Sequence, residues 1–423
     1  MRIGIDARVG GGWSGGVEMV VLGLAQGFSK LSDGDEEYHF LVKPGEADWL
    51  EPFLGDNCRL LMSRAPKPER HVATTRNLGG RLSYWWQRRH ERKLAKDMAR
   101  RLGAPESVEG SNGRIEAAGI DLMHFTIQHA IATDIPHIYH PHDLQHLHFP
   151  DFFDPEEIAR RERVYRYFCK SARMVATVSS WVKSDVVAQY DLPEEKVSVV
   201  PFAPPNLGYG TPDAADLKQA IEKFGLPKQF AFYPAQTWKH KNHIRLIEAA
   251  ARLRESGGAD ISFVFSGQKN DHHKAIAARA TELGFEQNIR FIGFVSPIEL
   301  QCLYSLARCV VVPSLHEAAS FPIWEAFLAN TPVACSSVTS LPEQVGEAAL
   351  LFDPEDVGRI GEALNRIWSD EKLRQDLASR GKKRVDDLNW ERTCRHFRAH
   401  YRRLLGSPLT SDDQALLRSS PFL

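Results

Sequence analysis

The sequence predicts an α/β protein built from two Rossmann-like, doubly wound domains. At 423 residues the chain is longer than a single hydrophobic core usually supports. Short apolar segments typical of buried strands alternate with helical segments, stop at a Pro- and Gly-rich stretch, and then begin again. The composition, 43% hydrophobic and 25% charged, is that of a globular protein. Each half is therefore expected to hold a parallel sheet with helices on both faces.

The first domain is expected to span residues 1–205. Its expected strands are RIGIDARV, YHFLVKP, DLMHF, HIYHPHD and RMVATVSS. Its expected helices are VEMVVLGLAQGF, after a glycine cluster, and the polar segment from Pro155 to Ser171. The stretch VVPFAPPNLGYGTPD is rich in Pro and Gly and predicts an interdomain linker.

The second domain is expected to span residues 206–385. Its expected strands are QFAFYPA, ISFVFSG, NIRFIGF, CVVVPS and PVACSS, and its helices are KNHIRLIEAAARLRE, KAIAARATELG, IELQCLYSLA and FPIWEAFLAN. A further helix is expected at residues 390–406, before a loose tail at 407–423. Doubly wound sheets bind ligands beyond the carboxyl ends of their strands, so two facing domains predict a cleft for a nucleotide and a second substrate.

Bulk properties exclude several functional classes. A formal net charge of −1 does not favour nucleic-acid binding. The six cysteines form no CxxC pair and are typical of reduced thiols. The first residues include Asp6 and Arg8 and lack the apolar core of a signal peptide, and no run of about 18 apolar residues occurs. We therefore expect a cytoplasmic protein.

The most informative segment is PSLHEAASFPIWEAFLANTPVACSS. It places Glu317 in a loop after a strand and Glu325 eight residues later, inside a helix whose first turn accommodates Pro322. The N–H groups at this positive helix end predict a phosphate site, and they belong to Ala319, Ser320 and Phe321. The alternative is that Glu325 is a partly exposed helix residue and Glu317 a capping group.

This segment resembles the E-x7-E motif of the retaining glycosyltransferases of family 4, which have the GT-B fold of two Rossmann-like domains and a C-terminal crossover helix. Further blocks agree in order and spacing, so that the resemblance covers nearly the whole chain. They are GGVE, HDLQHLHFP, TVSSWVKSDV, the KN of WKHKN, FSG, FIGFVSPIELQCLYSLARCVVVPS and SLPEQVGEAALLFDP. HDLQHLHFP and SFPIWEA also resemble bacterial mannosyltransferases of surface-polysaccharide assembly.

The resemblance implies roles for individual residues. Glu317 is expected to hold donor sugar hydroxyls, Glu325 to bind the ribose, and Lys241 to bind phosphate. A departing diphosphate gathers negative charge, which a fixed cation stabilises. The backbone around Gly267, Phe294 and Val295 is expected to bind the donor as well. Without the resemblance, Lys241 is interpreted as a solvated lysine at a helix end.

The chain departs from the family at a second cation. Family members commonly carry an arginine about six residues before the phosphate-binding lysine, where this chain has Ala235 and Gln236. Lys239 and His240 are the candidates to replace its charge.

HDLQHLHFP follows a strand, so His142 is expected to face the cleft, and the resemblance places it near the donor sugar, with Asp143 as its neighbour. The competing interpretation is a zinc site, because five histidines crowd together here and a His-x3-His pair can ligate zinc. They are His137, His140, His142, His146 and His148. The family uses a lysine and a helix end in place of a metal, so we expect neither metal nor other cofactor.

Gly15 and Gly16 follow the first strand and are expected to bring backbone N–H groups to the cleft. Gly10, Gly12 and Gly15 also satisfy G-x-G-x-x-G, the signature of a dinucleotide enzyme, but the second strand ends in Lys43 where that signature needs an acidic residue. A purely structural tight turn remains the alternative.

Residues 76–101 hold nine Lys or Arg and two acidic residues, together with Tyr84, Trp85 and Trp86. A basic, aromatic helical segment suits an anionic membrane surface or a lipid-diphosphate acceptor. The alternative is a solvated basic face.

The resulting functional expectation is a retaining hexosyltransferase that moves mannose from GDP-mannose to a lipid-linked or saccharide acceptor in polysaccharide or lipopolysaccharide synthesis. In similar enzymes an oxygen of the leaving phosphate accepts the proton of the acceptor hydroxyl. UDP-sugars and other GDP-sugars remain open as donors. Two other functional classes also remain: a nucleotide-sugar epimerase of the same fold and a non-catalytic partner subunit.

Overall fold

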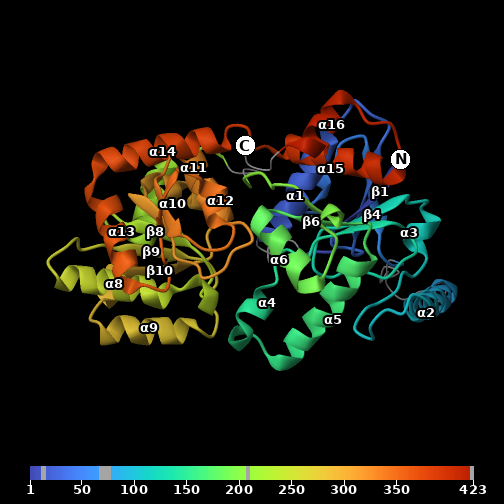
Figure 1. Cartoon of the computed structure of the whole chain (residues 1–423). Coiled ribbons are helices and arrows are strands. Elements are labelled where there is room, and N and C mark those ends of the chain that lie inside the picture. Colours follow the sequence, from blue (N-terminus) through green and yellow to red (C-terminus); the bar gives the residue numbers. More distant parts are fainter. Residues whose placement is uncertain (11–15, 66–77, 206–209, 420–423) are drawn as a thin grey trace. The chain divides into compact units, whose positions relative to one another are not determined.

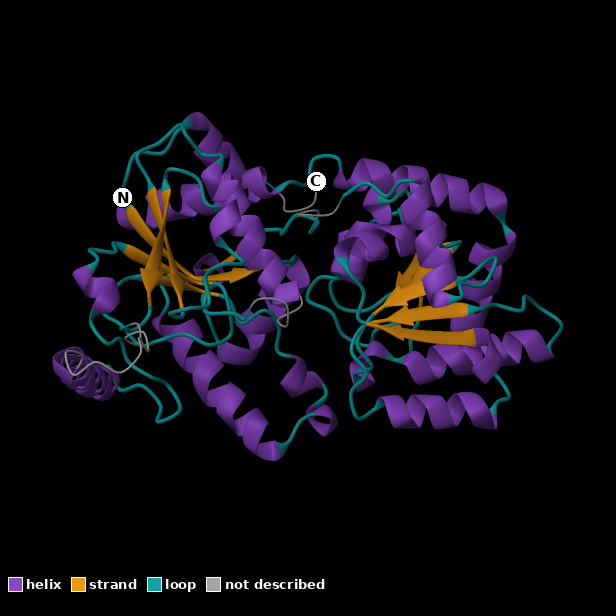
Figure 2. Ribbon diagram, turned by 180° about the vertical axis from the view of Figure 1, so that it is seen from behind, coloured by secondary structure: helices purple, strands orange, loops and turns teal. Residues whose placement is uncertain are grey.

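The computed structural model of this chain describes residues 1–10, 16–65, 78–205 and 210–419. The chain divides into two compact units. Unit 1 contains Met1–Phe202 and the described part of Trp390–Pro421, and unit 2 contains Ala203–Asn389. Each unit is a parallel sheet between helices (Figures 1 and 2).

Unit 1 contains a seven-stranded parallel sheet in the order β3-β2-β1-β4-β5-β6-β7. The direction of strand succession reverses between β1 and β4, which makes this pair the switch point of a doubly wound sheet. The strands are β1 (Arg2–Asp6), β2 (Glu37–Val42), β3 (Cys58–Met62), β4 (Leu122–Phe125), β5 (His137–Tyr139), β6 (Met174–Thr177) and β7 (Val197–Val199). The helices are α1 (Gly16–Ser29), α2 (Leu78–Arg101), α3 (Arg114–Ala117), α4 (Gln145–His148), α5 (Pro155–Ser171), α6 (Ser180–Tyr190), α15 (Trp390–Leu405) and α16 (Ser411–Arg418).

Unit 2 repeats the arrangement with six parallel strands in the order β10-β9-β8-β11-β12-β13, and its switch point lies between β8 and β11. The strands are β8 (Ala231–Pro234), β9 (Phe263–Ser266), β10 (Ile289–Gly293), β11 (Cys309–Val312), β12 (Val333–Ser336) and β13 (Ala349–Phe352). The helices are α7 (Ala214–Phe224), α8 (His243–Glu255), α9 (His273–Glu282), α10 (Pro297–Leu306), α11 (Phe321–Leu328), α12 (Leu341–Val345), α13 (Val357–Ser369) and α14 (Glu371–Val385).

The strands form because their residues are buried on both faces. Every residue of β4, β6, β9, β11 and β12 is buried, as expected of strands covered by helices on both sides. Runs such as Cys309–Val312 therefore read as continuous apolar segments with no alternation. The parallel order places all carboxyl ends at one edge of each sheet, and the loops that follow them carry the residues discussed below.

The C-terminal segment completes unit 1. Helix α15 packs on α1, and Gly23 makes the approach possible, because a Cβ atom there would lie 2.0 Å from the Trp390 ring. Where a loose tail was expected, the structure has helix α16, which begins with a capping box at Thr410. Buried Asp413 of α16 accepts from Arg402 Nη1 at 2.8 Å, and Glu36 accepts from Arg402 Nε at 2.7 Å. These ion pairs anchor the segment.

Candidate functional site

The switch point of unit 2 brings together two of the predicted residues. Lys241 lies in a short 3₁₀ turn (Lys239–Lys241) after β8, and Glu317 lies in the loop between β11 and α11. Because β8 and β11 are hydrogen-bonded neighbours whose following segments diverge, their carboxyl ends form the crevice in which doubly wound sheets bind ligands.

Lys241 and Glu317 form an ion pair in which Lys241 Nζ donates to Glu317 Oε1 at 2.6 Å. Ser314 Oγ donates to the same carboxylate oxygen at 2.6 Å. The Tyr233 hydroxyl lies 3.0 Å from Ser314 Oγ and donates to the Lys241 carbonyl at 3.1 Å. A cation and a carboxylate from two separate loops are thus held side by side, although 76 residues separate them in the chain.

Helix α11 begins beside this pair. Its N-cap residue, Ser320, makes no capping bond with its side chain, and Pro322 occupies the first turn. The structure corrects one expectation: the Ser320 N–H group is not available to a ligand, because it donates to Gln344 Oε1 at 2.8 Å. The Ser320 hydroxyl, in contrast, is buried and has no partner among the described residues. A buried hydroxyl without a partner costs free energy, so this group is suited to a ligand.

Glu325 faces inward from α11. Its side chain is buried, and Glu325 Oε2 accepts a hydrogen bond from the hydroxyl of Tyr304 at 2.5 Å. Tyr304 lies on α10 and is itself fully buried. This carboxylate is therefore oriented by a neighbouring helix and is not the partly exposed helix residue that the alternative interpretation required.

The loops after β9 and β10 meet beside the same edge. Gly267 has a φ of +116°, and a Cβ atom there would lie 2.8 Å from the backbone of Ala235, so glycine is required. Its N–H group donates to the Gly293 carbonyl at 2.7 Å, so this one N–H of the expected donor-binding backbone is engaged within unit 2. Phe294, next to Gly293, is 81% exposed, and Val295 is partly exposed.

Of the two candidates to replace the family's second cation, Lys239 and His240, the structure leaves Lys239. Gln236 accepts a hydrogen bond from Trp238 Nε1 at 3.0 Å through its side-chain oxygen. Burial, together with the charge of Lys241, lowers the pKa of His240 well below its usual range, so His240 is neutral near pH 7. Lys239 is exposed on the same turn.

In unit 1, His142 lies in the loop after β5 and adopts a left-handed backbone conformation with φ of 64°. Its Nε2 atom lies 2.9 Å from the Thr126 carbonyl. A carbonyl only accepts, so Nε2 carries the hydrogen and Nδ1 is left as an acceptor. Burial lowers the pKa of His142 and the Thr126 bond opposes this effect, so the ring is neutral at pH 7. Gly16 begins α1, whereas Gly15 lies outside the described residues.

The five neighbouring histidines bind different partners. His146 Nε2 lies 3.0 Å from Glu162, and His148 Nε2 lies 2.9 Å from Asp185. His140 Nε2 lies 2.8 Å from His124 Nε2, in a buried pair that stacks at 4.9 Å. Within the described ranges, no three His, Cys, Asp or Glu side chains gather as metal ligands.

Two family models match this chain, one in each unit. The model described as Glycosyltransferase Family 4 matches residues 54–202, and the model described as Glycosyl transferases group 1 matches residues 214–384. The chain belongs to glycosyltransferase family 4.

Relatives of this glycosyltransferase include proteins of O-antigen synthesis. O-antigen chain mannosyltransferase B of Escherichia coli is 28% identical over 254 residues, which are 59% of this chain and 66% of that protein. O-antigen chain mannosyltransferase RfbU of Salmonella typhimurium is 26% identical over 215 residues, which are 51% of this chain and 56% of that protein. The matches span between half and two thirds of the length of these relatives.

Among solved structures, the Anabaena protein HepE in complex with UDP and glucose is similar to this glycosyltransferase, with a TM-score of 0.68 and 18% identity. The similarity covers 95% of this chain and 99% of that chain. The expected fold, GT-B with two Rossmann-like domains and a returning C-terminal helix, is confirmed.

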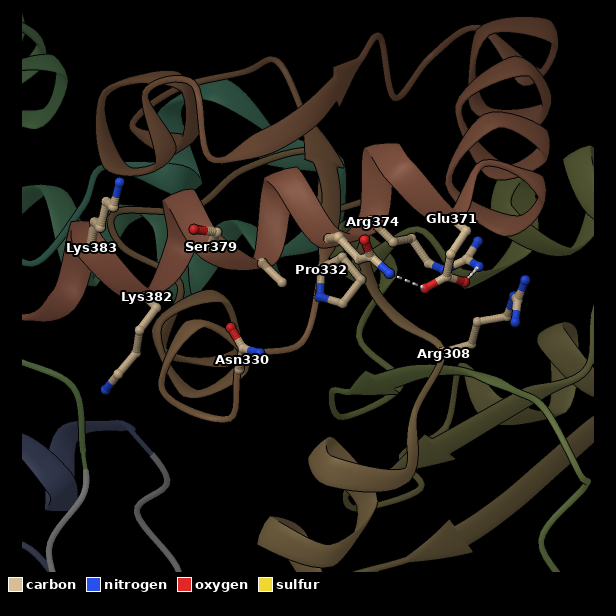
Figure 3. A pocket seen from close by; sticks show the side chains of 10 residues that line it. Arg308, Asn330, Pro332, Glu371, Arg374, Ser379, Lys382 and Lys383 are labelled. Atoms are coloured by element: carbon tan, nitrogen blue, oxygen red, sulfur yellow. Dashed lines mark hydrogen bonds and ion pairs between the residues drawn. The ribbon is translucent and has the colours of Figure 1, made fainter.

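A cavity of about 560 Å³ in unit 2 lies elsewhere, at the amino ends of the strands (Figure 3). Arg308 and Pro332, which line it, precede β11 and β12. Its most buried cation, Arg374, is already bound by the Ile367 and Trp368 carbonyls and by Glu371 (Figure 3). This cavity is therefore at the opposite edge from the candidate site, and its most buried charge has structural partners.

Sequence reasoning missed the residues that support the site. Ser314, Tyr233, Tyr304 and Gln344 orient or contact Glu317, Lys241, Glu325 and Ser320. Each is a polar side chain buried in or beside an apolar segment, and such a residue needs a hydrogen-bond partner. The sequence signals that need, but the partner depends on the fold.

Proposed function

We propose that this family 4 glycosyltransferase moves a hexose, mannose from GDP-mannose, to a lipid-linked or saccharide acceptor with retention of configuration, in polysaccharide or lipopolysaccharide synthesis. The observation that carries the proposal is the Lys241–Glu317 pair, 2.6 Å apart, together with the buried Ser320 hydroxyl at the N-cap of α11, three residues after Glu317. The mannosyltransferase relatives favour mannose as the sugar.

The donor is proposed to replace the Lys241–Glu317 contact with contacts of its own. Lys241 turns to the diphosphate, and Glu317 is released to accept hydrogen bonds from hydroxyls of the sugar. The Ser320 hydroxyl and the positive end of α11 add a donor and a favourable dipole for the phosphate. As the bond to the sugar breaks, the phosphate gains charge that these fixed groups stabilise more than they stabilise the bound substrate.

The remaining roles follow from the same arrangement. Glu325, held by Tyr304, is proposed to bind the ribose, and the backbone near Phe294 and Val295 to bind the rest of the nucleotide. Neutral His142 is proposed to accept a hydrogen bond from a sugar hydroxyl through Nδ1. A leaving phosphate oxygen is proposed to take the proton of the acceptor hydroxyl on the face from which the nucleotide departs, which gives retention without a protein base.

The proposal is tested by incubating the purified protein with GDP-mannose, other GDP-sugars and UDP-sugars, with and without bacterial lipid extract. Release of GDP that depends on the extract is expected, and NMR of the product is expected to show an α-linkage, as in the donor. Lys241→Ala removes the cation and abolishes most of this activity, whereas Lys218→Ala, an exposed residue on α7, serves as the control. Isomerised donor without an acceptor indicates the epimerase, and no turnover with any donor indicates a non-catalytic subunit.

Helix α2 is proposed to bring the enzyme to an anionic membrane that carries the acceptor, at the cytoplasmic face of the cell membrane. It is held to unit 1 by buried Glu91, which accepts from Arg114 Nε at 2.8 Å and from Arg88 Nη1 at 3.3 Å. Trp85 and Trp86, in contrast, are 62% and 69% exposed among exposed Arg and Lys side chains. No helix in the described residues has both the length and the apolar character to cross a bilayer.

Flotation with vesicles containing anionic phospholipid tests this part. Changing Arg89, Arg92, Lys93 and Lys96 to Glu is expected to abolish binding, because each basic residue contributes about 1 kcal/mol near such a surface. Arg88 is left intact because it pairs with Glu91. Unchanged flotation of the variant, or equal binding of the wild type to neutral vesicles, would refute the electrostatic contact.

A further inference from the structure

The segment that follows β12, residues 339–344, faces the loop between β11 and α11. Strands β11 and β12 are parallel neighbours, so the chain leaves both of them at the same edge of the sheet. Three side chains of the segment, those of Thr339, Ser340 and Gln344, form hydrogen bonds to the backbone of that loop. The segment therefore supports the residues that are proposed to bind the donor.

The Thr339 hydroxyl binds both backbone groups of Glu317. The Glu317 N–H group donates to Thr339 Oγ1 at 3.2 Å, and Thr339 Oγ1 donates to the Glu317 carbonyl at 2.9 Å. Ser340 Oγ donates to the same carbonyl at 2.7 Å. A hydroxyl has one hydrogen to donate and lone pairs that accept, so one threonine can serve both groups. The backbone of Glu317 is thus fixed by side chains of the neighbouring loop.

The Gln344 carboxamide binds both backbone groups of Ser320. Gln344 Oε1 accepts from the Ser320 N–H at 2.8 Å, and Gln344 Nε2 donates to the Ser320 carbonyl at 2.7 Å. The Gln344 side chain is buried, so water does not compete for these two bonds. The hydroxyl is then the polar group that Ser320 leaves for a ligand, since it has no partner among the described residues.

Thr339 keeps its hydroxyl in place despite an unfavourable backbone conformation. Its φ is 51°, in the left-handed region that a β-branched residue rarely adopts. Glycine or asparagine suits this conformation better, but neither carries a hydroxyl on Cβ. Strained residues of this kind occur where the side chain has a function. The strain at Thr339 therefore indicates that the hydroxyl itself matters.

Helix α12, which carries Gln344, is anchored from α14. The helix has only five residues and is too short to be stable by itself. Arg384 of α14 donates from Nη2 to the Glu343 carbonyl at 2.8 Å and from Nε to the Gln344 carbonyl at 3.2 Å. The Gln344 carboxamide is therefore held from behind as it holds Ser320.

We infer that Thr339 and Gln344 are positioning residues of the donor site. They fix the backbone at Glu317 and at Ser320, and so set the separation between the carboxylate that meets the sugar and the hydroxyl that meets the phosphate. The inference rests on the proposed function and names the residues that keep its site in shape. A small misplacement of groups around a reacting bond lowers turnover strongly, even when the substrate still binds.

Thr339→Val and Thr339→Ser together test the first residue. The former removes the hydroxyl and keeps the branched shape, and the latter keeps the hydroxyl. With GDP-mannose, kcat is expected to fall roughly 10- to 100-fold in Thr339→Val and to be restored in Thr339→Ser. Calorimetric affinity for GDP, which lacks the sugar, should stay at the wild-type value in both variants, because Lys241 and Ser320 still meet the diphosphate.

Thr331→Val is the matched control, because Thr331 lies before β12 whereas Thr339 lies after it. Its buried hydroxyl also donates to a backbone carbonyl, that of Tyr304, at 2.8 Å. The control should lose stability in urea and keep its kcat. Comparing kcat with the free energy of unfolding in all three variants thus separates a positioning role from a structural one.

Gln344→Met tests the second residue, because it removes both bonds to Ser320 and keeps the length of the side chain. Hydrogen exchange of peptides covering residues 317–321 is measured in the ligand-free full chain, at a urea concentration of zero. Exchange is expected to be faster in Gln344→Met and in Thr339→Val than in the wild type. This readout needs no donor, so it does not depend on the proposed function.

The inference is overturned if Thr339→Val keeps the wild-type kcat, or if Thr339→Ser loses as much turnover as Thr339→Val. Unchanged exchange over residues 317–321 in Gln344→Met would also overturn it. So would equal losses of kcat and of GDP affinity in Thr339→Val, because these indicate a general structural defect. Absence of turnover by the wild type with every donor refutes the proposed function instead, and the exchange comparison then still decides whether the two side chains hold the loop.

Discussion

Each unit has a basic side chain paired with a carboxylate at the switch point of its sheet. The two pairs differ in the chain segments that carry the paired residues. In unit 2, Lys241 and Glu317 come from different loops and are both partly accessible, with side chains 21% and 10% exposed. In unit 1, Asp6 is the last residue of β1 and Arg8 follows it by two residues, and Asp6 is completely buried. The first pair joins two segments, whereas the second stiffens one.

The difference indicates which pair a ligand can replace. Separating Lys241 from Glu317 exposes both to a ligand that carries phosphate and hydroxyl groups. Separating Arg8 from Asp6 leaves a carboxylate in the interior of the sheet, where an unpaired charge is costly. We therefore expect the unit 2 pair to exchange partners during the reaction and the unit 1 pair to remain intact.

The largest expected effect is that of Lys241→Ala on turnover. Loss of one fixed group that stabilises developing charge lowers kcat by roughly 10²–10³-fold in enzymes of comparable design. Steady-state release of GDP measures this, and the free energy of unfolding should change by less than about 1 kcal/mol, because Ser314 still donates to Glu317. If the variant is inactive only because it unfolds at a lower urea concentration, the expectation that the Lys241–Glu317 pair exchanges partners is contradicted.

Asp6→Asn, in contrast to Lys241→Ala, is expected to lower the free energy of unfolding markedly. It leaves Arg8 without its charged partner, and breaking a buried pair on one side costs about 3 kcal/mol of stability. Urea unfolding followed by circular dichroism provides the measurement, with Glu317→Gln as the matched change in unit 2. Equal losses of stability in the two variants would remove the distinction between the units.

Lowering the pH is expected to reduce the stability of unit 1 more than that of unit 2. Burial lowers the pKa of His124 to about 3 and of His137 and His396 to about 4 in unit 1, and that of His243 to about 3 in unit 2. Since an unfolded histidine titrates near 6.5, the unfolded chain binds more protons between about pH 4 and 6.5. The stabilisation is present above 6.5 and is lost through that window as pH falls.

Each such histidine costs about 2 kcal/mol of stability between pH 7 and 5. Hydrogen exchange read peptide by peptide at the two pH values, corrected for intrinsic rates, reports each unit separately. Slower or equal loss of protection in unit 1 compared with unit 2 contradicts the expectation.

The smallest expected effect concerns the Ser320 hydroxyl at the start of α11. Ser320→Ala removes a hydroxyl without a partner in the described chain, so stability should be unchanged while affinity for GDP-mannose falls about tenfold. Ser296→Ala is the matched control in unit 2, because its hydroxyl accepts from the Glu299 N–H and caps α10. The control should lose about 1 kcal/mol of stability and keep its affinity. The reverse result would make Ser320 an ordinary cap.

Much of the fold was predictable because its central strands are buried on both faces. The segments that became β1, β4, β9, β11 and β12 are short apolar runs between helical patterns. Strands β3, β7 and β13 were missed for physical reasons: β3 and β13 have exposed or partly exposed positions that blur their apolar pattern, and β7 has only three residues. Helix α16 was missed because its stability comes from a cap at Thr410 and from the buried contact of Asp413 with Arg402.

The amino-acid sequence by itself determined the two-domain α/β architecture, the positions of Lys241 and Glu317 after strands and of Glu325 inside a helix, and the family. Periodicity and helix-end chemistry are local properties, so they can be read along the chain. Only the tertiary structure decided which groups are engaged: Ser320 N–H with Gln344, Gly267 N–H with Gly293, and Arg8 with Asp6. Hydrogen-bond partners and burial arise from contacts between distant segments, and those contacts decide which groups remain for a ligand.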